Sequence, residues 1–186
     1  MMDMRTYIIA AAAVAACQSL AIAGMILTHN QMLNTGREVV IQSAFVDPRS
    51  LFRGHYVIIN LRPGDLTKSA IESDGTFKPR ETVFVELVQQ EGIYWVAKKL
   101  WRNVPKATTN PVIKGTMMWD PKKDTQPYRI RFPFDRYFAP RSRAKALEKI
   151  QADQKLGVVL SLQDDGTGLI KGLMVDGQVV YDESVF

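Results

Sequence analysis

The stretch Arg53-Gly54-His55-Tyr56-Val57-Ile58-Ile59-Asn60-Leu61 has the pattern of a turn that leads into a β-strand. Gly54 lets the backbone take a positive φ without a clash at Cβ. The residues after it alternate, so that successive side chains fall on opposite faces of an extended strand. Pro48 precedes the stretch and Pro63 follows it, and both favour turns, because proline fixes φ and has no N–H for a strand ladder. The pattern predicts a strand but no chemistry.

The N-terminal segment has the length of a membrane span. Residues 7–27 are 21 residues without a charge. At about 1.5 Å per residue, a helix of this length covers a hydrocarbon core of roughly 30 Å. Arg5 precedes the run and Arg37 is the first Lys or Arg after it. The positive-inside rule therefore predicts a cytoplasmic amino terminus and an exported domain, in the periplasm or outside the cell.

Two other interpretations of this segment stay open. A cleaved signal peptide would use a site such as Ala21-Ile22-Ala23, and a lipoprotein would be acylated at Cys17, since Val14-Ala15-Ala16-Cys17 resembles a lipobox. The apolar run continues past Cys17, where a mature lipoprotein normally becomes polar, so we favour an uncleaved transmembrane helix. We divide the chain into an anchor (1–29), a linker (30–37) that follows a solvated His29, and an exported domain (38–186).

The domain has the pattern of an antiparallel β protein. Short alternating runs recur, separated by turns that contain Gly, Asp or Pro; expected strands are 38–46, 55–61, 82–89, 93–101, 112–119, 128–132, 156–162, 168–175 and 178–181. One amphipathic helix is expected at 141–154, after Pro140. The sequence therefore predicts a mainly β fold, either barrel-like or a curled sheet, with one packed helix.

The positive charge is concentrated in one segment. Between Asp120 and Lys149 there are nine cations and four acids; the cations are Lys122, Lys123, Arg129, Arg131, Arg136, Arg141, Arg143, Lys145 and Lys149. This segment could attract anionic lipid headgroups or an acidic partner. We do not expect nucleic acid, because the domain is predicted to be exported and lacks a basic-aromatic recognition pattern.

Few residues suit catalysis. One cysteine and two histidines give no metal-ligand pattern, and no cofactor-binding loop occurs, so we expect neither a metal nor a cofactor. The enzyme alternative is a membrane-tethered hydrolase with Ser50 as nucleophile and Lys98 or Lys99 as base. A lysine base needs burial, and the sequence around Ser50 lacks a hydrolase signature. We therefore favour a protein that is not an enzyme.

The chain resembles the GDYXXLXY family of bacterial membrane-anchored proteins. The family motif aligns with residues 54–61, of which Gly54 and Tyr56 match and His55 replaces the family's Asp. The segment Asp135-Arg136-Tyr137-Phe138 and the closing Asp176-Gly177 hairpin are similar to the family's second half. The resemblance implies an N-terminal anchor and an exported β domain, often accompanied by multi-pass membrane proteins. We expect the anchor to lie in the bacterial inner membrane and the domain to be periplasmic or extracellular.

The sequence thus predicts a single-pass protein of the bacterial envelope that acts as a non-enzymatic interaction module. Its expected partner is a multi-pass inner-membrane protein. A lipoprotein with the same β domain is a further alternative. The expected recognition residues come from two segments of the chain: Arg53, Gly54, His55, Tyr56, Arg136, Tyr137 and Phe138.

Overall fold

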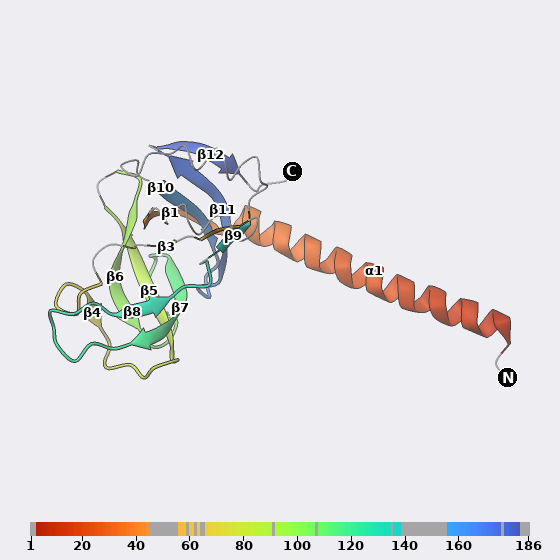
Figure 1. The fold of residues 1–186 in the computed structure, drawn as a ribbon, viewed down its shortest axis with the longest axis horizontal. Coiled ribbons are helices and arrows are strands. Elements are labelled where there is room, and N and C mark those ends of the chain that lie inside the picture. Colours follow the sequence, from red (N-terminus) through yellow and green to blue (C-terminus); the bar gives the residue numbers. More distant parts are fainter. Residues whose placement is uncertain are drawn as a thin grey trace.

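A long helix and a β domain make up the computed structural model of the chain (Figure 1). The structure describes residues 3–44, 56–58, 60–61, 63, 66–90, 92–106, 108–134, 136–138, 156–175 and 177–182. At residues 44, 56–58, 60, 136–138 and 181 it describes the backbone alone. The predicted helix at 141–154 lies outside the described residues.

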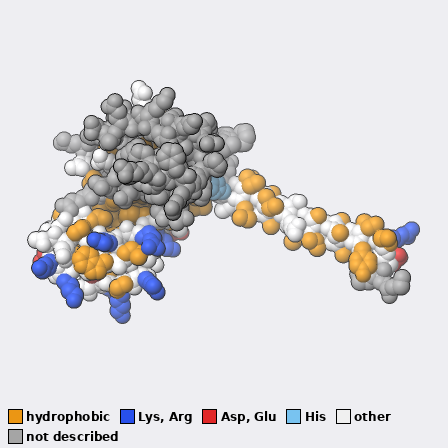
Figure 2. Space-filling model, in the orientation of Figure 1, with side chains coloured by type: hydrophobic (Ala, Val, Ile, Leu, Met, Phe, Trp, Pro, Cys, Tyr) orange, Lys and Arg blue, Asp and Glu red, His pale blue; other side chains and the backbone are white. Residues whose placement is uncertain are grey.

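The helix α1 (Met4–Thr35) has 32 residues and projects away from the β domain (Figure 1). Its most apolar window has a mean hydropathy of 2.0 and is not buried by the rest of the chain. Hydrophobic side chains follow it along its length (Figure 2). At about 1.5 Å per residue, such a helix is longer than the roughly 30 Å needed to cross a bilayer core. α1 is therefore long and apolar enough to span a membrane.

The helix also continues further than the sequence indicates. Residues 30–35 were expected to belong to a linker, but they form the last turns of α1, with His29 exposed on the helix before them. The helix ends at Gly36, whose extended backbone leads directly into the first strand. Leu33 is buried against the domain, with an exposed fraction of 4%. This apolar contact explains why the polar segment is ordered as helix.

The first sheet has the order β12-β11-β10-β1-β3, and its neighbouring strands are antiparallel. Its strands are β1 (Arg37–Ala44), β3 (Asn60–Leu61), β10 (Leu156–Leu162), β11 (Gly168–Val175) and β12 (Gln178–Asp182). Val39 and Ile41 of β1 are buried, as alternation predicts for a strand with one face on a core. The predicted hairpin between β10 and β11 is confirmed.

The second sheet has the order β4-β6-β5-β7-β8. Its strands are β4 (Glu72–Ser73), β5 (Thr82–Gln89), β6 (Trp95–Trp101), β7 (Val112–Trp119) and β8 (Arg129–Arg131). The predicted hairpin between β5 and β6 is confirmed, with a bulge between Glu86 and Leu87. Val83, Val85 and Leu87 are fully buried, as expected from their common face. A third pair, β2 (Tyr56–Ile58) with β9 (Arg136–Phe138), forms a two-stranded ribbon.

The two larger sheets bury one common core. The buried cluster takes side chains from both sheets, including Val39, Ile41, Val85, Leu100, Ile113, Val158, Leu160 and Leu173. The sheets also touch at the backbone, where the amide of Lys114 on β7 donates to the carbonyl of Gly166 in the β10–β11 loop at 2.8 Å. The prediction of a mainly β fold is confirmed. Of the two forms expected, the barrel is not found: the described strands form separate sheets that do not close.

Candidate functional site

Tyr56, the one described residue of the first predicted recognition segment, lies beside the second segment in the fold. Strand β2 pairs antiparallel with β9, which places Tyr56 opposite Phe138 and Val57 opposite Tyr137. About 80 residues separate these strands in the chain, so their pairing was not predicted from the sequence. Arg53, Gly54 and His55 lie outside the described residues. Of the predicted surface, the structure therefore describes only the backbone of Tyr56 and of residues 136–138. The role of this surface in recognition stays a prediction.

Strand β9 was not predicted. No strand was expected between the strand at 128–132 and the helix at 141–154, whereas Arg136, Tyr137 and Phe138 are extended. A weak signal was present, since the strand contains two adjacent aromatic residues, Tyr137 and Phe138, of types that favour strands. A run of three residues is too short to show a period, and its pairing partner is distant in the sequence. Such a strand is difficult to find from local patterns.

The two lysines of the hydrolase alternative do not have the environment of a general base. Lys98 is exposed. The Nζ of Lys99 lies 3.5 Å from Glu72 Oε2 and 4.2 Å from the centroid of the Trp101 ring. A lysine base needs a buried amine, whereas the side chain of Lys99 keeps an exposed fraction of 25%. Ser50 lies outside the described residues, so its distance from either lysine is not tested.

A buried carboxylate is the strongest polar feature of the second sheet. Glu86 on β5 has an exposed fraction of 5% and accepts three side-chain hydrogen bonds. The donors are Trp101 Nε1 at 2.7 Å, Asn110 Nδ2 at 2.8 Å and Thr108 Oγ1 at 2.9 Å. Two of them belong to the loop between β6 and β7. Glu86 thus ties this loop to the outer face of the sheet.

The hydrogen bonds also set the charge of Glu86. Burial alone would raise the pKa of this carboxyl, because it penalises the charged form. The bonds from Asn110, Trp101 and Thr108, together with the charge of Lys98, outweigh burial and hold the pKa of Glu86 below its ordinary value. An ionised carboxylate with three donors has a structural role here, because the donors already engage both of its oxygens. This role of Glu86 was not predicted from the sequence, because alternation along β5 places Glu86 on the face opposite Val83, Val85 and Leu87.

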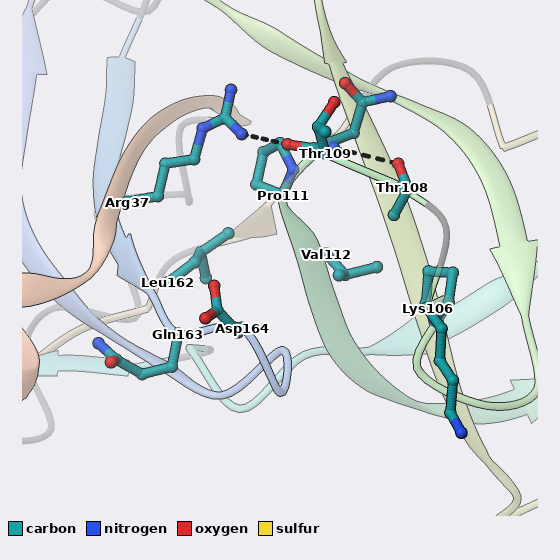
Figure 3. Close-up of a pocket in the computed structure, with 11 residues that line it drawn as sticks. Arg37, Lys106, Thr108, Thr109, Pro111, Val112, Leu162, Gln163 and Asp164 are labelled. Atoms are coloured by element: carbon teal, nitrogen blue, oxygen red, sulfur yellow. Dashed lines mark hydrogen bonds between the residues drawn. The ribbon is translucent and has the colours of Figure 1, made fainter.

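Two pockets lie on either side of this loop. The first has a volume of about 310 Å³, and its lining includes Arg37, Lys106, Thr109, Gln163 and Asp164 (Figure 3). The Arg37 guanidinium donates to the carbonyl of Thr109 and lies 5.1 Å from the centroid of the Trp95 ring. The second pocket, of about 400 Å³, includes Glu86 in its lining. Both are polar hollows suited to hydrogen-bonding groups.

The described part of the chain offers no metal centre. No group of three or more His, Cys, Asp or Glu residues among the described residues could hold a metal ion. The pockets place carboxylates beside lysines and threonines, an arrangement typical of polar contacts within a fold.

Comparison with known proteins gives one match. The model of the GDYXXLXY family, described as GDYXXLXY protein, matches residues 18–173, whereas no curated protein and no solved structure matches the chain. The match begins within α1 at residue 18, so the family pattern includes the second half of the helix together with most of the β domain. Family membership and the apolar helix together indicate a membrane-anchored protein. The chain belongs to the GDYXXLXY family.

Proposed function

We propose that this protein is a non-enzymatic interaction module, held in the inner membrane by α1, whose β domain contacts a multi-pass membrane protein from the periplasmic side. The observation that carries the proposal is the junction between the helix and the domain. The backbone carbonyl of Met32 accepts hydrogen bonds from Ser161 Oγ at 2.7 Å and from Gln163 Nε2 at 2.9 Å. Leu33 is buried one residue further on.

This junction fixes the domain relative to the membrane-spanning helix. A tethered enzyme that acts on soluble substrates gains from a flexible linker, because the linker increases its reach. A module that contacts a neighbouring membrane protein gains from a fixed orientation, since less conformational freedom is lost on binding. The helix, which ends directly in β1 at Arg37, supports the second arrangement.

The orientation rests on charge. Arg5 precedes the apolar run, and the next Lys or Arg is Arg37, at the start of β1. The positive-inside rule then favours a cytoplasmic amino terminus and a periplasmic domain. Within the domain, the paired strands β2 and β9 carry Tyr56 and Arg136–Phe138, which we propose as part of the contact surface.

The test is affinity capture of the full-length protein from membranes dissolved in a mild detergent, followed by mass spectrometry. His55→Ala and Arg136→Glu are the variants, and Lys106→Glu, an exposed residue of another loop, is the charge-matched control for the second. We expect one multi-pass membrane protein with the parent chain and with the control, and its loss with either variant. A parent chain that captures no specific membrane protein would contradict the proposal.

A further inference from the structure

An aromatic and basic surface lies on β7, β8 and the loop between them. Trp119 and Met118 have exposed fractions of 37% and 38%. The guanidinium of Arg129, opposite Trp119 in the strand register, lies 5.8 Å from the centroid of its ring. Figure 2 shows hydrophobic side chains ringed by Lys and Arg over this end of the domain. We call this the hairpin surface; its residues are Met118, Trp119, Lys122, Lys123, Arg129 and Arg131.

The hairpin surface carries an excess of positive charge among the described residues: its loop also holds the exposed Asp124, so four cations stand against one exposed carboxylate. None of the carboxylates in the described part of the chain lies within ion-pair distance of its four cations. Asp120 is close in sequence but turns inward: its Oδ2 accepts a bond of 2.7 Å from the amide of Phe77, and its Oδ1 lies 3.7 Å from Lys68 Nζ. The surface therefore has a positive potential that suits an anionic partner.

The composition of the hairpin surface is that of a binding surface. Trp, Met and Arg are enriched in the buried centres of protein interfaces, and Trp and Arg are frequent among the residues that dominate binding energy. A single exposed apolar residue needs no explanation, but here two adjacent ones are flanked by a cation that contacts the ring. The lysines of the loop would form a polar rim around this centre.

We propose that the hairpin surface docks an acidic segment of a partner protein, with the carboxylates on Arg129, Arg131 and the loop lysines and an apolar side chain on Trp119. The inference rests on the proposed function and names the chemistry of its partner. A protein suits the site better than the chain's own bilayer, because β4 and β8 lie at the end of the domain opposite α1 (Figure 1). A bilayer crossed by α1 lies on the other side of the domain.

The test uses full-length protein in nanodiscs of neutral phosphatidylcholine, so that the bilayer does not compete for the surface. The probe is a fluorescent peptide of alternating Glu and Phe residues, and its anisotropy reports binding. We expect Arg129→Glu combined with Arg131→Glu to weaken binding about tenfold or more, because both contacts become repulsive. Trp119→Ala should weaken it by about tenfold, through loss of the apolar centre.

Two controls make the result specific. Lys106→Glu changes an exposed cation on the loop between β6 and β7, which is not part of the hairpin surface, and should leave binding within about twofold. Vesicles with phosphatidylglycerol test the lipid alternative. The inference is overturned if the peptide does not bind, if all variants bind it equally, or if the vesicles and not the peptide depend on the surface. A captured multi-pass protein that the hairpin variants retain would overturn this inference and leave the proposed function intact.

Discussion

The backbone carbonyl of Met32, at the end of the membrane helix, accepts a hydrogen bond of 2.7 Å from Ser161 Oγ on β10, 129 residues further along the chain. Ser161 is fully buried, so this bond is shielded from water, and Gln163 donates a second bond to the same oxygen. Carbonyls in the last turn of a helix have no partner within the helix. Ser161 and Gln163 of the β domain supply that partner for Met32, and so cap the C-terminal end of α1.

The first prediction concerns the space at this cap. A Cβ on Gly36 would collide with Ser161 Oγ, and it would lie 2.6 Å from Gln163 Nε2 and 3.0 Å from the backbone nitrogen of Leu162. We expect Gly36→Ala to lower the free energy of unfolding of the domain by about 1–3 kcal/mol, as overpacking does elsewhere. Urea unfolding of the full-length protein in micelles, followed by tryptophan fluorescence, measures this change, since the three tryptophans lie at positions 95, 101 and 119.

Gly24→Ala is the control for the first prediction. A Cβ on Gly24 meets nothing within 4 Å, and Ala favours a helix over Gly. This variant should unfold with the same midpoint as the parent chain. Equal midpoints for Gly36→Ala and Gly24→Ala would show that the junction has room for a Cβ at position 36, and would contradict this prediction.

The second prediction separates backbone strain from contact between the sheets. Gly166 and Gly177 both have φ of 81°, a conformation that favours glycine. A Cβ on Gly166 would lie 3.1 Å from the backbone nitrogen of Lys114 and 3.2 Å from Phe84 Cδ1, whereas a Cβ on Gly177 meets nothing within 4 Å. Gly177→Ala should therefore cost about 1 kcal/mol from strain alone. Gly166→Ala should cost about 1–3 kcal/mol more, by overpacking.

The same urea titration measures both variants. The Gly166 substitution should in addition weaken the hydrogen bond between the Gly166 carbonyl and the Lys114 amide, which hydrogen exchange at that amide reports. If both substitutions cost the same, the β10–β11 loop does not contribute to the contact between the sheets.

Local patterns in the sequence predict most of the larger strands. The β5–β6 and β10–β11 hairpins follow from short loops that contain glycine between alternating runs, and both elements of such a signal are close in the chain. Strands β4 and β9 depend instead on distant partners: Glu72 pairs with Lys99, and Tyr137 pairs with Val57. Two or three residues show no period, so the alternation that predicts the larger strands is absent from these two.

The polar contacts were not predictable for the same reason. Glu86 was expected on the face away from the core, and it does point there, but the loop that carries Thr108 and Asn110 folds over it. Residues 30–35 read as a linker because they are polar, and they become helix because Leu33 packs on the domain. In both cases burial comes from a segment far away in the sequence.

The third prediction concerns the acid stability of the domain. The lowered pKa of Glu86 means that its stabilising effect is fully present above its ordinary pKa of about 4.3 and is lost as the pH falls through its lower pKa in the folded state. Glu86→Gln removes the charge at every pH. The loss of unfolding free energy in this variant should therefore be largest at neutral pH and should shrink below about pH 4.

Truncation of the same side chain measures how much the Glu86 carboxylate contributes to the free energy of unfolding. Glu86→Ala leaves the donors on Trp101, Thr108 and Asn110 without their acceptor, and it should cost about 2–4 kcal/mol at neutral pH. Glu72→Gln is the control on the same sheet, since Glu72 is exposed and its pair with Lys99 is of the surface kind, worth about 1 kcal/mol at most. A pH dependence that is the same in Glu86→Gln and in the parent chain would contradict the assignment.

The fourth prediction distinguishes a helical anchor from a lipid anchor. The helix α1 passes through Cys17 without interruption, and Cys17 is exposed on it. We expect Cys17→Ser to remain in the membrane fraction after carbonate washing, because a span of about 20 apolar residues holds the chain without a lipid. The intact mass of the parent protein should equal that of the whole chain without an acyl group. A parent protein that begins at an acylated Cys17 would establish the lipoprotein alternative.

The Cys17→Ser chain has no other cysteine, which allows the fifth prediction, on orientation, to be tested with single cysteines. Asp3 precedes the helix and Thr125 lies in the loop between β7 and β8, and both are exposed. In spheroplasts, a maleimide that cannot cross membranes should label Thr125→Cys directly and Asp3→Cys only after permeabilisation. This result is expected because Arg5 favours the cytoplasmic side. Direct labelling of Asp3→Cys together with protection of Thr125→Cys would reverse the orientation and place the hairpin surface in the cytoplasm.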